Sequence, residues 1–168
     1  TEGNKIVFVG SNSGAKKWAG PATSNIDLKC RLMLPGFIDN HTHFVSGGFY
    51  LLGIDLRKAK STGEFKKIIQ EYASTHQGEW ITGGDWDHEA WEVKDLPTRW
   101  MIDDVSSSTP IAVNRFDGHM LLANSYALQL AGITKDTPSP AGGTIVKDPK
   151  TGEPTGILKD AAMDLIFS

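Results

Sequence analysis

The order of apolar and polar residues in the first part of the chain predicts three β-strands. Residues 6–9 are all apolar, which is typical of a short buried strand. Between residues 28 and 34 every second position is apolar, as in a half-buried strand, and Pro35-Gly36 ends it. A third, more continuously apolar strand begins at Phe37-Ile38-Asp39 and continues into a pair of histidines.

Helical patterns follow in the second part of the chain. Ser61 and Glu64 form a capping box, and apolar residues with helical spacing follow over residues 65–73, so we expect an amphipathic helix that Gly78 ends. Asn124 predicts the cap of a second helix over residues 125–131, closed by Gly132. A last helix is expected to start near Asp160.

Short apolar segments between these helices predict the remaining strands. They lie at residues 80–82 and 111–113, and residues 144–147 and 155–158 flank a polar turn that predicts a hairpin. Strands that alternate with helices indicate an α/β fold with a largely parallel sheet. We therefore expect a parallel βα arrangement from Phe37 onward, with residues 5–34 in a separate small β layer.

Composition narrows the class of protein. The chain has 168 residues, 39% of them hydrophobic and 22% charged, as in a soluble globular protein. The 17 Lys and Arg against 20 Asp and Glu form no long basic run, which argues against nucleic acid or a membrane as partner. Cys30 is the single cysteine, so no internal disulfide requires an oxidising compartment. No signal peptide is seen, but we expect the native N-terminus to lie outside this sequence, so the compartment stays open with the cytoplasm favoured.

The pattern His41-x-His43 is the sharpest chemical signal. Side chains two residues apart on a strand share a face, so both imidazoles would converge on one divalent metal, most simply zinc. Asp39 has the same parity and could orient a ligand imidazole. The alternative is that the two histidines simply lie on a surface strand, because a catalytic zinc holds three protein ligands and this pair supplies only two. The position after an apolar strand is where parallel α/β folds keep their active sites.

The residues around these histidines resemble a known family. Leu34-Pro35-Gly36-Phe37-Ile38-Asp39-Asn40-His41-Thr42-His43 is similar to the first-strand signature of the amidohydrolase superfamily. The rest resembles its family-3 branch, which includes YtcJ-like proteins and N-substituted formamide deformylases. The matching segments include Gly83-Gly84-Asp85-Trp86-Asp87, Leu96-Pro97-Thr98-Arg99, Arg115-x-Asp117-Gly118-His119 and Gly152-Glu153-Pro154-Thr155-Gly156-Ile157-Leu158-Lys159-Asp160.

The resemblance implies a fold and a domain division. It implies the first half of a metal-dependent hydrolase (β/α)8 barrel, since a whole barrel needs about 250 residues. Residues 1–34 would be part of a small N-terminal β-sandwich, and residues 35–168 the first part of the barrel with an inserted subdomain. The family's later histidines and catalytic aspartate would lie outside this sequence, so we expect the chain alone to be inactive.

Further site residues follow from the same resemblance. His119 lies where the family faces its substrate and could hydrogen-bond a substrate carbonyl, or it could fix its own loop. Arg115 and Asp117 are candidate pocket residues that could instead simply pair with each other. Trp86 and Asp87 could line the substrate pocket, or could pack an inserted subdomain. His76 and His88 are interpreted as solvated surface residues.

Asp160 and Lys159 leave two interpretations open. Asp160 occupies a position that is usually acidic in the family, so it is a candidate metal ligand. It could equally cap the helix expected to follow. Lys159 as a metal-bridging carbamate is a weaker alternative.

The function implied is hydrolysis of amide or formamide carbon–nitrogen bonds. The cofactor would be a divalent metal, zinc being preferred, with one or two ions in the full-length enzyme. The partner would be a small-molecule amide-type substrate, and homo-oligomerisation stays open. The competing hypothesis is a truncated or degenerate amidohydrolase-like module that binds a partner without catalysis.

Overall fold

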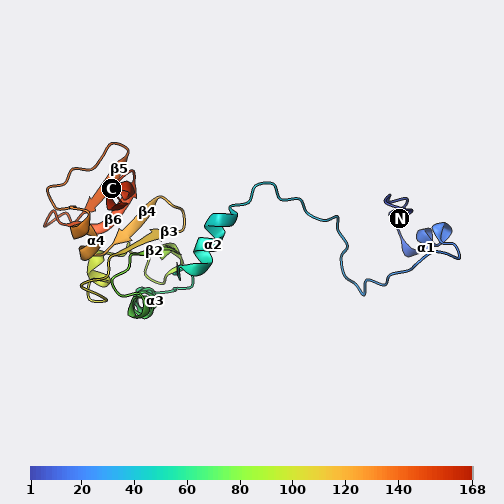
Figure 1. Ribbon diagram of the computed structural model, residues 1–168, viewed down its shortest axis with the longest axis horizontal. Helices are drawn as coiled ribbons and strands as arrows, with labels where there is room; N and C mark the ends of the chain where they lie inside the picture. The colour runs from blue at the N-terminus through green and yellow to red at the C-terminus, as the bar shows by residue number, and fades with distance from the viewer. Residues whose placement is uncertain (168) are drawn as a thin grey trace. The chain divides into compact units, whose positions relative to one another are not determined.

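The computed structural model describes residues 1–167, except for the side chain of Ser46. The chain divides into two compact units, Thr1–Thr42 and His43–Ser168. Figure 1 shows the course of the chain and the elements of each unit.

The first unit contains little regular structure. It has a short helix α1 (Asn12–Ala15), capped by the Ser11 hydroxyl, and a 3₁₀ turn η1 (Lys16–Trp18). The strands predicted at residues 6–9 and 28–34 are wrong, because only an isolated bridge joins Glu2 and Lys5 in this unit. Alternation specifies which face of a strand is apolar, but a strand also needs a neighbour for its N–H and C=O groups, and the described residues offer none here.

The third predicted strand, at residues 37–39, is also wrong. These residues have no regular structure, and the side chains of Phe37 and Ile38 are 87% and 94% exposed. The first regular element after them is helix α2 (Phe44–Leu52), with His43 as its N-cap residue. The parallel βα arrangement therefore begins later in the chain than predicted.

The described residues of the second unit form six strands, two helices and three 3₁₀ turns besides α2. The elements are β1 (Ile54–Asp55), α3 (Thr62–Thr75), β2 (Ile81–Trp86), η2 (His88–Ala90), η3 (Arg99–Met101), β3 (Ile111–Arg115), β4 (Met120–Ala123), α4 (Ser125–Leu130), β5 (Gly143–Lys147), β6 (Pro154–Asp160) and η4 (Met163–Phe167).

The strands form one mixed sheet in the order β1-β2-β3-β4-β6-β5. β1, β2 and β3 pair in parallel, whereas β4, β6 and β5 pair antiparallel to their neighbours. The prediction of an α/β fold is confirmed, and the expected parallel pairing holds for β1 to β3 only. The predicted hairpin is confirmed as β5 and β6.

Both faces of the sheet are covered, because its side chains pack into two separate cores, one with α3 and the other with α4. Successive residues of β4 show the alternation: Leu122 belongs to the core that includes Phe65 and Ile69 of α3, and Leu121 to the core that includes Leu128 of α4. Because side chains on a strand alternate between faces, a buried strand with helices on both sides is apolar at every position. No helix in the described part of the chain is long and apolar enough to span a membrane.

The two predicted helices are confirmed, with their caps. The Ser61 hydroxyl accepts the Glu64 N–H at 3.2 Å, while the Glu64 carboxylate accepts the Lys60 N–H at 2.8 Å, one residue earlier than in the standard capping box. The Asn124 side chain accepts the N–H groups of Ala127 and Ile111 and donates to the Thr109 carbonyl, so it caps α4 and ties it to β3. The last predicted helix is a 3₁₀ turn that begins at Met163, three residues beyond Asp160.

Candidate active site at the carboxyl edge of the sheet

Polar side chains gather at the edge of the sheet where the parallel strands end. β1, β2 and β3 finish at this edge, and because β4 is antiparallel to β3 and β6 is antiparallel to β4, β4 begins there and β6 ends there. The residues placed there by the strand ends are Asp55, Asp85, Asp87, Arg115, Asp117, His119 and Asp160. The carboxyl edge is where open α/β sheets bind ligands.

His119 and Asp160 are brought together by the pairing of β4 with β6. Met120 lies opposite Lys159, so the residues flanking that pair adjoin. The His119 Nδ1 atom lies 2.9 Å from Asp160 Oδ1, and the Asp160 N–H donates to the His119 carbonyl at 3.0 Å. Asp160 does not cap the following helical turn, since it ends β6 and two residues separate it from η4. The half-buried Lys159 precedes it.

Arg115, Asp117 and Asp87 form a charged network beside His119. Arg115 Nη1 donates to Asp117 Oδ2, and Arg115 Nη2 lies 3.9 Å from Asp87 Oδ1. Asp117 Oδ1 accepts the backbone N–H of His119 at 3.1 Å. The pairing of Arg115 with Asp117 considered from the sequence is therefore present, and it supports the turn that carries His119.

Asp55, Arg57 and Asp85 form a second charged group on the ends of β1 and β2. Both oxygens of Asp55 accept hydrogen bonds from the Arg57 guanidinium, at 2.8 and 3.0 Å, and these bonds lower the pKa of Asp55. Partial burial raises the pKa of Asp85, and the nearby positive charge of Arg57 offsets this only in part. The sequence interpretation missed this group, in which Asp55 ends β1 and Asp85 is the penultimate residue of β2.

The structure decides between the two interpretations of Trp86 and corrects that of His88. Trp86 does not line a pocket: it is fully buried against Phe65 and Trp91, and its indole N–H donates to the Val113 carbonyl at 2.9 Å. Only the packing interpretation of Trp86 fits this position. His88 is not a solvated surface residue either, because it is 7% exposed and packs edge-on against Trp86. His76 is partly buried and stacks on Tyr72.

His41 and His43 lie outside the sheet. His41 has no regular structure around it and its N–H donates to the Asp39 carboxylate at 3.1 Å, while His43 precedes α2. Strand alternation therefore does not fix the directions of the two imidazoles. The division between the two units falls between Thr42 and His43, so His41 belongs to the first unit and His43 to the second.

The donor set at these positions fits part of a metal site. Two imidazoles separated by one residue, with a carboxylate at Asp39, are the donors that zinc and related ions prefer. Among the described residues no group of three or more His, Cys, Asp or Glu side chains is arranged to hold an ion. The motif thus supplies two ligands of the three that a catalytic zinc normally has.

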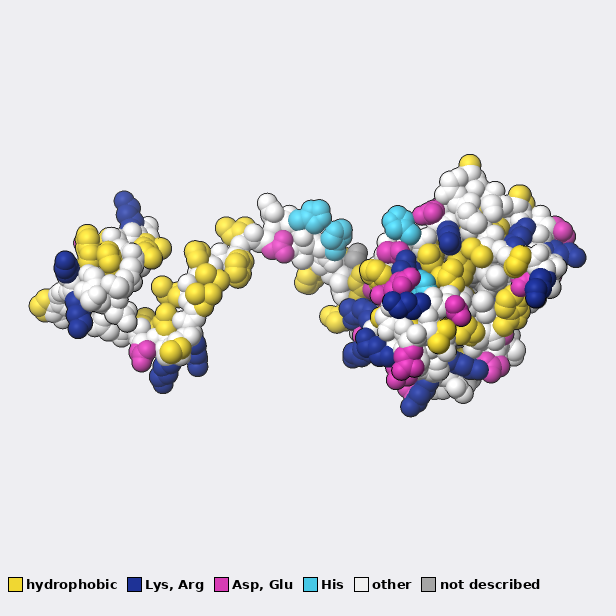
Figure 2. All heavy atoms as spheres, turned by 180° about the vertical axis from the view of Figure 1, so that it is seen from behind, with side chains coloured by type: hydrophobic (Ala, Val, Ile, Leu, Met, Phe, Trp, Pro, Cys, Tyr) yellow, Lys and Arg dark blue, Asp and Glu magenta, His cyan; other side chains and the backbone are white. Residues whose placement is uncertain are grey.

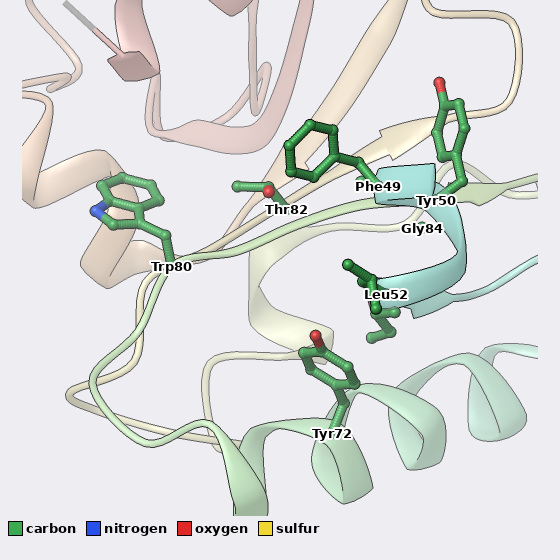
Figure 3. A pocket seen from close by; sticks show the side chains of 10 residues that line it. Phe49, Tyr50, Leu52, Tyr72, Trp80, Thr82 and Gly84 are labelled. Atoms are coloured by element: carbon green, nitrogen blue, oxygen red, sulfur yellow. The ribbon is translucent and has the colours of Figure 1, made fainter. Parts of the chain in front are cut away.

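An apolar cavity adjoins the charged group of Asp55, Arg57 and Asp85, since Tyr50, Ile54 and Gly84 line both. It has a volume of about 430 Å³ and is lined by aromatic residues of α2 and α3 together with Trp80 and Thr82, as Figure 3 shows. Phe49 and Tyr50 on its wall are 70% and 54% exposed. On the face of the molecule seen in Figure 2, Lys and Arg side chains are interspersed with Asp and Glu, so charges of both signs share this surface.

Comparison with known proteins places these features in a family context. A sequence model described as "Amidohydrolase family" matches residues 25–168. The protein LONG AFTER FAR-RED 3 of Arabidopsis thaliana is 40% identical over 163 residues, which cover 96% of this chain and 28% of that protein. An N-substituted formamide deformylase of Arthrobacter pascens is 31% identical over 169 residues, 99% of this chain and 31% of that enzyme.

A solved structure shares the fold. The crystal structure of an uncharacterized metal-dependent hydrolase from Pyrococcus horikoshii OT3 superposes with a TM-score of 0.54 at 28% sequence identity. The match covers 79% of this chain and 23% of that structure. The chain thus spans about a third or less of the length of these relatives.

Proposed function

The chain belongs to the amidohydrolase family, and we propose from this that its function is metal-dependent hydrolysis of amide or formamide carbon–nitrogen bonds in a small molecule. The observation that carries the proposal is the His41-x-His43 motif, which lies inside the segment that matches the family. The similarity to an N-substituted formamide deformylase supports the carbon–nitrogen bond as the target. The likeness to a metal-dependent hydrolase supports the need for a divalent ion.

The proposed fold of the full-length protein is a (β/α)8 barrel with a small β-sandwich. We assign residues 1–34 to the sandwich and residues 35–168 to the first part of the barrel with an inserted subdomain. The mixed sheet of β1 to β6 would then be that subdomain, because it contains antiparallel strands whereas the strands of such a barrel are all parallel. Its carboxyl edge would supply residues to the substrate site.

His41 and His43 are the proposed metal ligands, and zinc is the preferred ion because both donors are imidazoles. When bound, the ion supplies Lewis acidity that activates a water molecule and polarises the scissile carbonyl. The Asp39 carboxylate accepts a hydrogen bond from the backbone N–H of His41 and so positions the first ligand. Asp160 could add a further ligand, but in the described residues its carboxylate is hydrogen-bonded to His119.

His119, Asp87, Arg115 and Asp117 are the proposed substrate-site residues. The His119 ring is 74% exposed at the carboxyl edge, so it can reach a bound molecule. Arg115 is mostly buried between Asp87 and Asp117, which favours a supporting role over direct contact. Because only two ligands of a catalytic metal are identified in the sequence, we propose that the 168-residue chain alone does not turn over substrate.

Turnover of simple amides tests the proposed function. The full-length gene product would be assayed against N-formyl and N-acyl amines after metal removal and again after zinc is restored. Release of amine that requires the restored ion supports the proposal. If no member of the panel is hydrolysed and the purified protein instead retains a binding partner, the chain is a binding module of this family without catalysis.

A further inference from the structure

His119 is an exposed residue whose position is nevertheless fixed from three directions. Its N–H donates to Asp117, its carbonyl accepts the N–H of Asp160, and its ring nitrogen Nδ1 contacts the Asp160 carboxylate. The ring itself is 74% exposed, and Nε2 has no hydrogen-bond partner among residues 1–167. Its free nitrogen therefore faces solvent at the carboxyl edge of the sheet.

The Arg115 guanidinium supports the turn that carries His119. The Arg115 side chain is only 15% exposed and bonds Asp117, which in turn holds the His119 backbone. The turn between them closes through the Gly118 N–H and the Arg115 carbonyl, at 3.0 Å. This partly buried ion pair connects the end of β3 to the turn that carries His119.

Asp160 reaches His119 from an unfavourable backbone conformation. Its φ is +49°, which side-chain-bearing residues adopt at a cost, although Asp and Asn tolerate it better than others. An exposed histidine–carboxylate pair contributes little to folding stability. Stability alone therefore does not account for a carboxylate held in this way against an exposed imidazole.

We propose that Asp160 is a positioning residue that keeps the His119 proton on Nδ1, so that Nε2 presents its lone pair to an N–H group of the amide substrate. The hydrogen bond made by one ring nitrogen sets which tautomer a neutral histidine adopts. A carboxylate accepts only, so it selects the Nδ1–H form. Nε2 would then contact the N–H of the substrate and not its carbonyl. This assignment of the substrate contact rests on the proposed function.

The substrate class follows from the role of Nε2 as a hydrogen-bond acceptor. Primary and secondary amides carry the N–H that Nε2 would accept, whereas N,N-disubstituted amides do not. A site arranged to bond a polar group discriminates against analogues that lack it. We expect a secondary formamide to be preferred over its N-methylated analogue by about tenfold or more in kcat/KM.

Nitrogen NMR of the histidine rings tests the positioning role without any assay of activity. In the full-length gene product, at a pH where the ring is neutral, His119 should show a protonated Nδ1 and an unprotonated Nε2. Asp160→Gly removes the carboxylate and suits the positive φ, and it should yield a mixture of both tautomers. Asp160→Asn places an amide that can donate to Nδ1 as well as accept from it, so it should also fail to hold the ring in the Nδ1–H form alone. Asp104→Ala, which breaks an exposed ion pair with Lys66, is the matched control and should change nothing.

The outcomes separate this inference from the proposed function. A wild-type ring that is already a mixture, or one that Asp160→Gly leaves unchanged, overturns the positioning role. Loss of bound zinc in Asp160→Gly with an unchanged tautomer would make Asp160 a metal ligand instead. In the activity assay, Asp160→Gly should reduce the preference for the secondary amide towards unity. Absence of any amide turnover by the wild type overturns the proposed function and the substrate contact, while the NMR result still decides the positioning role.

Discussion

Replacement of Gly156 by alanine should destabilise the sheet at the strand that carries Asp160. Gly156 lies in β6 with φ +98°, and a Cβ there would stand 2.5 Å from the Ala123 carbonyl oxygen of β4 and 2.9 Å from the Arg99 Cβ. The left-handed backbone costs an L-residue about 1–2 kcal/mol. Overpacking against rigid backbone adds about 1–3 kcal/mol. The sum of about 2–5 kcal/mol is a large part of the stability of an ordinary domain, roughly 5–15 kcal/mol.

Thermal unfolding of two matched variants measures this clash separately from backbone strain. For a domain of this size about 1 kcal/mol shifts Tm by roughly 2–4 °C, so Gly156→Ala should lower Tm by about 10 °C. Gly83 in β2 also has a positive φ, +81°, but an added Cβ meets no atom within 4 Å, so Gly83→Ala should lose only the strain, about 5 °C. Equal losses in the two variants would show that β6 does not approach β4 and Arg99 as closely as described.

Two further predictions concern the core and the charged group on β1 and β2. Trp86→Ala should cost about 3–5 kcal/mol in a urea titration, because Trp86 is fully buried, whereas Trp100→Ala, at a residue 49% exposed, should cost about 1 kcal/mol; similar losses would place Trp86 at the surface. Burial raises the pKa of Asp85 in the folded protein above its unfolded value near 3.8. The charge of Asp85 therefore opposes folding at a pH above the folded-state pKa, and this effect disappears at a pH below the unfolded value. Asp85→Asn should raise Tm at neutral pH, and the gain should fade in acid. Hydrogen bonds from Arg57 lower the pKa of Asp55 in the folded protein. The charge of Asp55 therefore stabilises the fold at a pH above the unfolded-state pKa, and this stabilisation is lost as the pH falls through the folded-state pKa. Asp55→Asn should lower Tm at neutral pH, and Tm shifts of the same sign in Asp55→Asn and Asp85→Asn would contradict the account.

The sequence predicted the elements whose determinants are local. Helix α3 begins at the Ser61 cap and α4 at Asn124 because one side chain and the nearest N–H groups decide where each starts. The hairpin of β5 and β6 follows from a polar turn between two apolar segments. These signals act within a few residues, so they can be read without knowing the rest of the fold.

The strands that failed depend on partners that the pattern does not contain. Residues 6–9, 28–34 and 37–39 have strand-like sequences but no neighbouring strand in the described chain. Conversely, β2 extends beyond the predicted residues 80–82, through Gly83 and Gly84 to Trp86, because β1 and β3 on either side supply its hydrogen bonds. Strand formation is thus decided by tertiary pairing more than by intrinsic propensity.

The candidate site was predicted as a set of residues but not as an arrangement. His119 and Asp160 were each selected from motifs, yet their contact joins positions 41 residues apart and depends on the register of β4 with β6. The sequence left pocket lining and packing open for Trp86, because its burial depends on Phe65 and Trp91 packing around it. His41 and His43 as metal ligands remain a prediction.

The metal content of histidine variants tests the central claim most directly. In the full-length gene product, His41→Ala and His43→Ala should each lose nearly all bound zinc, because removing one ligand from a site with few ligands removes much of its affinity. His76→Ala is the control, since His76 stacks on Tyr72 in α3 and is not proposed as a ligand. We expect wild-type zinc content in His76→Ala and near-zero content in the other two, with circular dichroism unchanged in all three. Full zinc content in either His41→Ala or His43→Ala would contradict the assignment of this pair as the metal site.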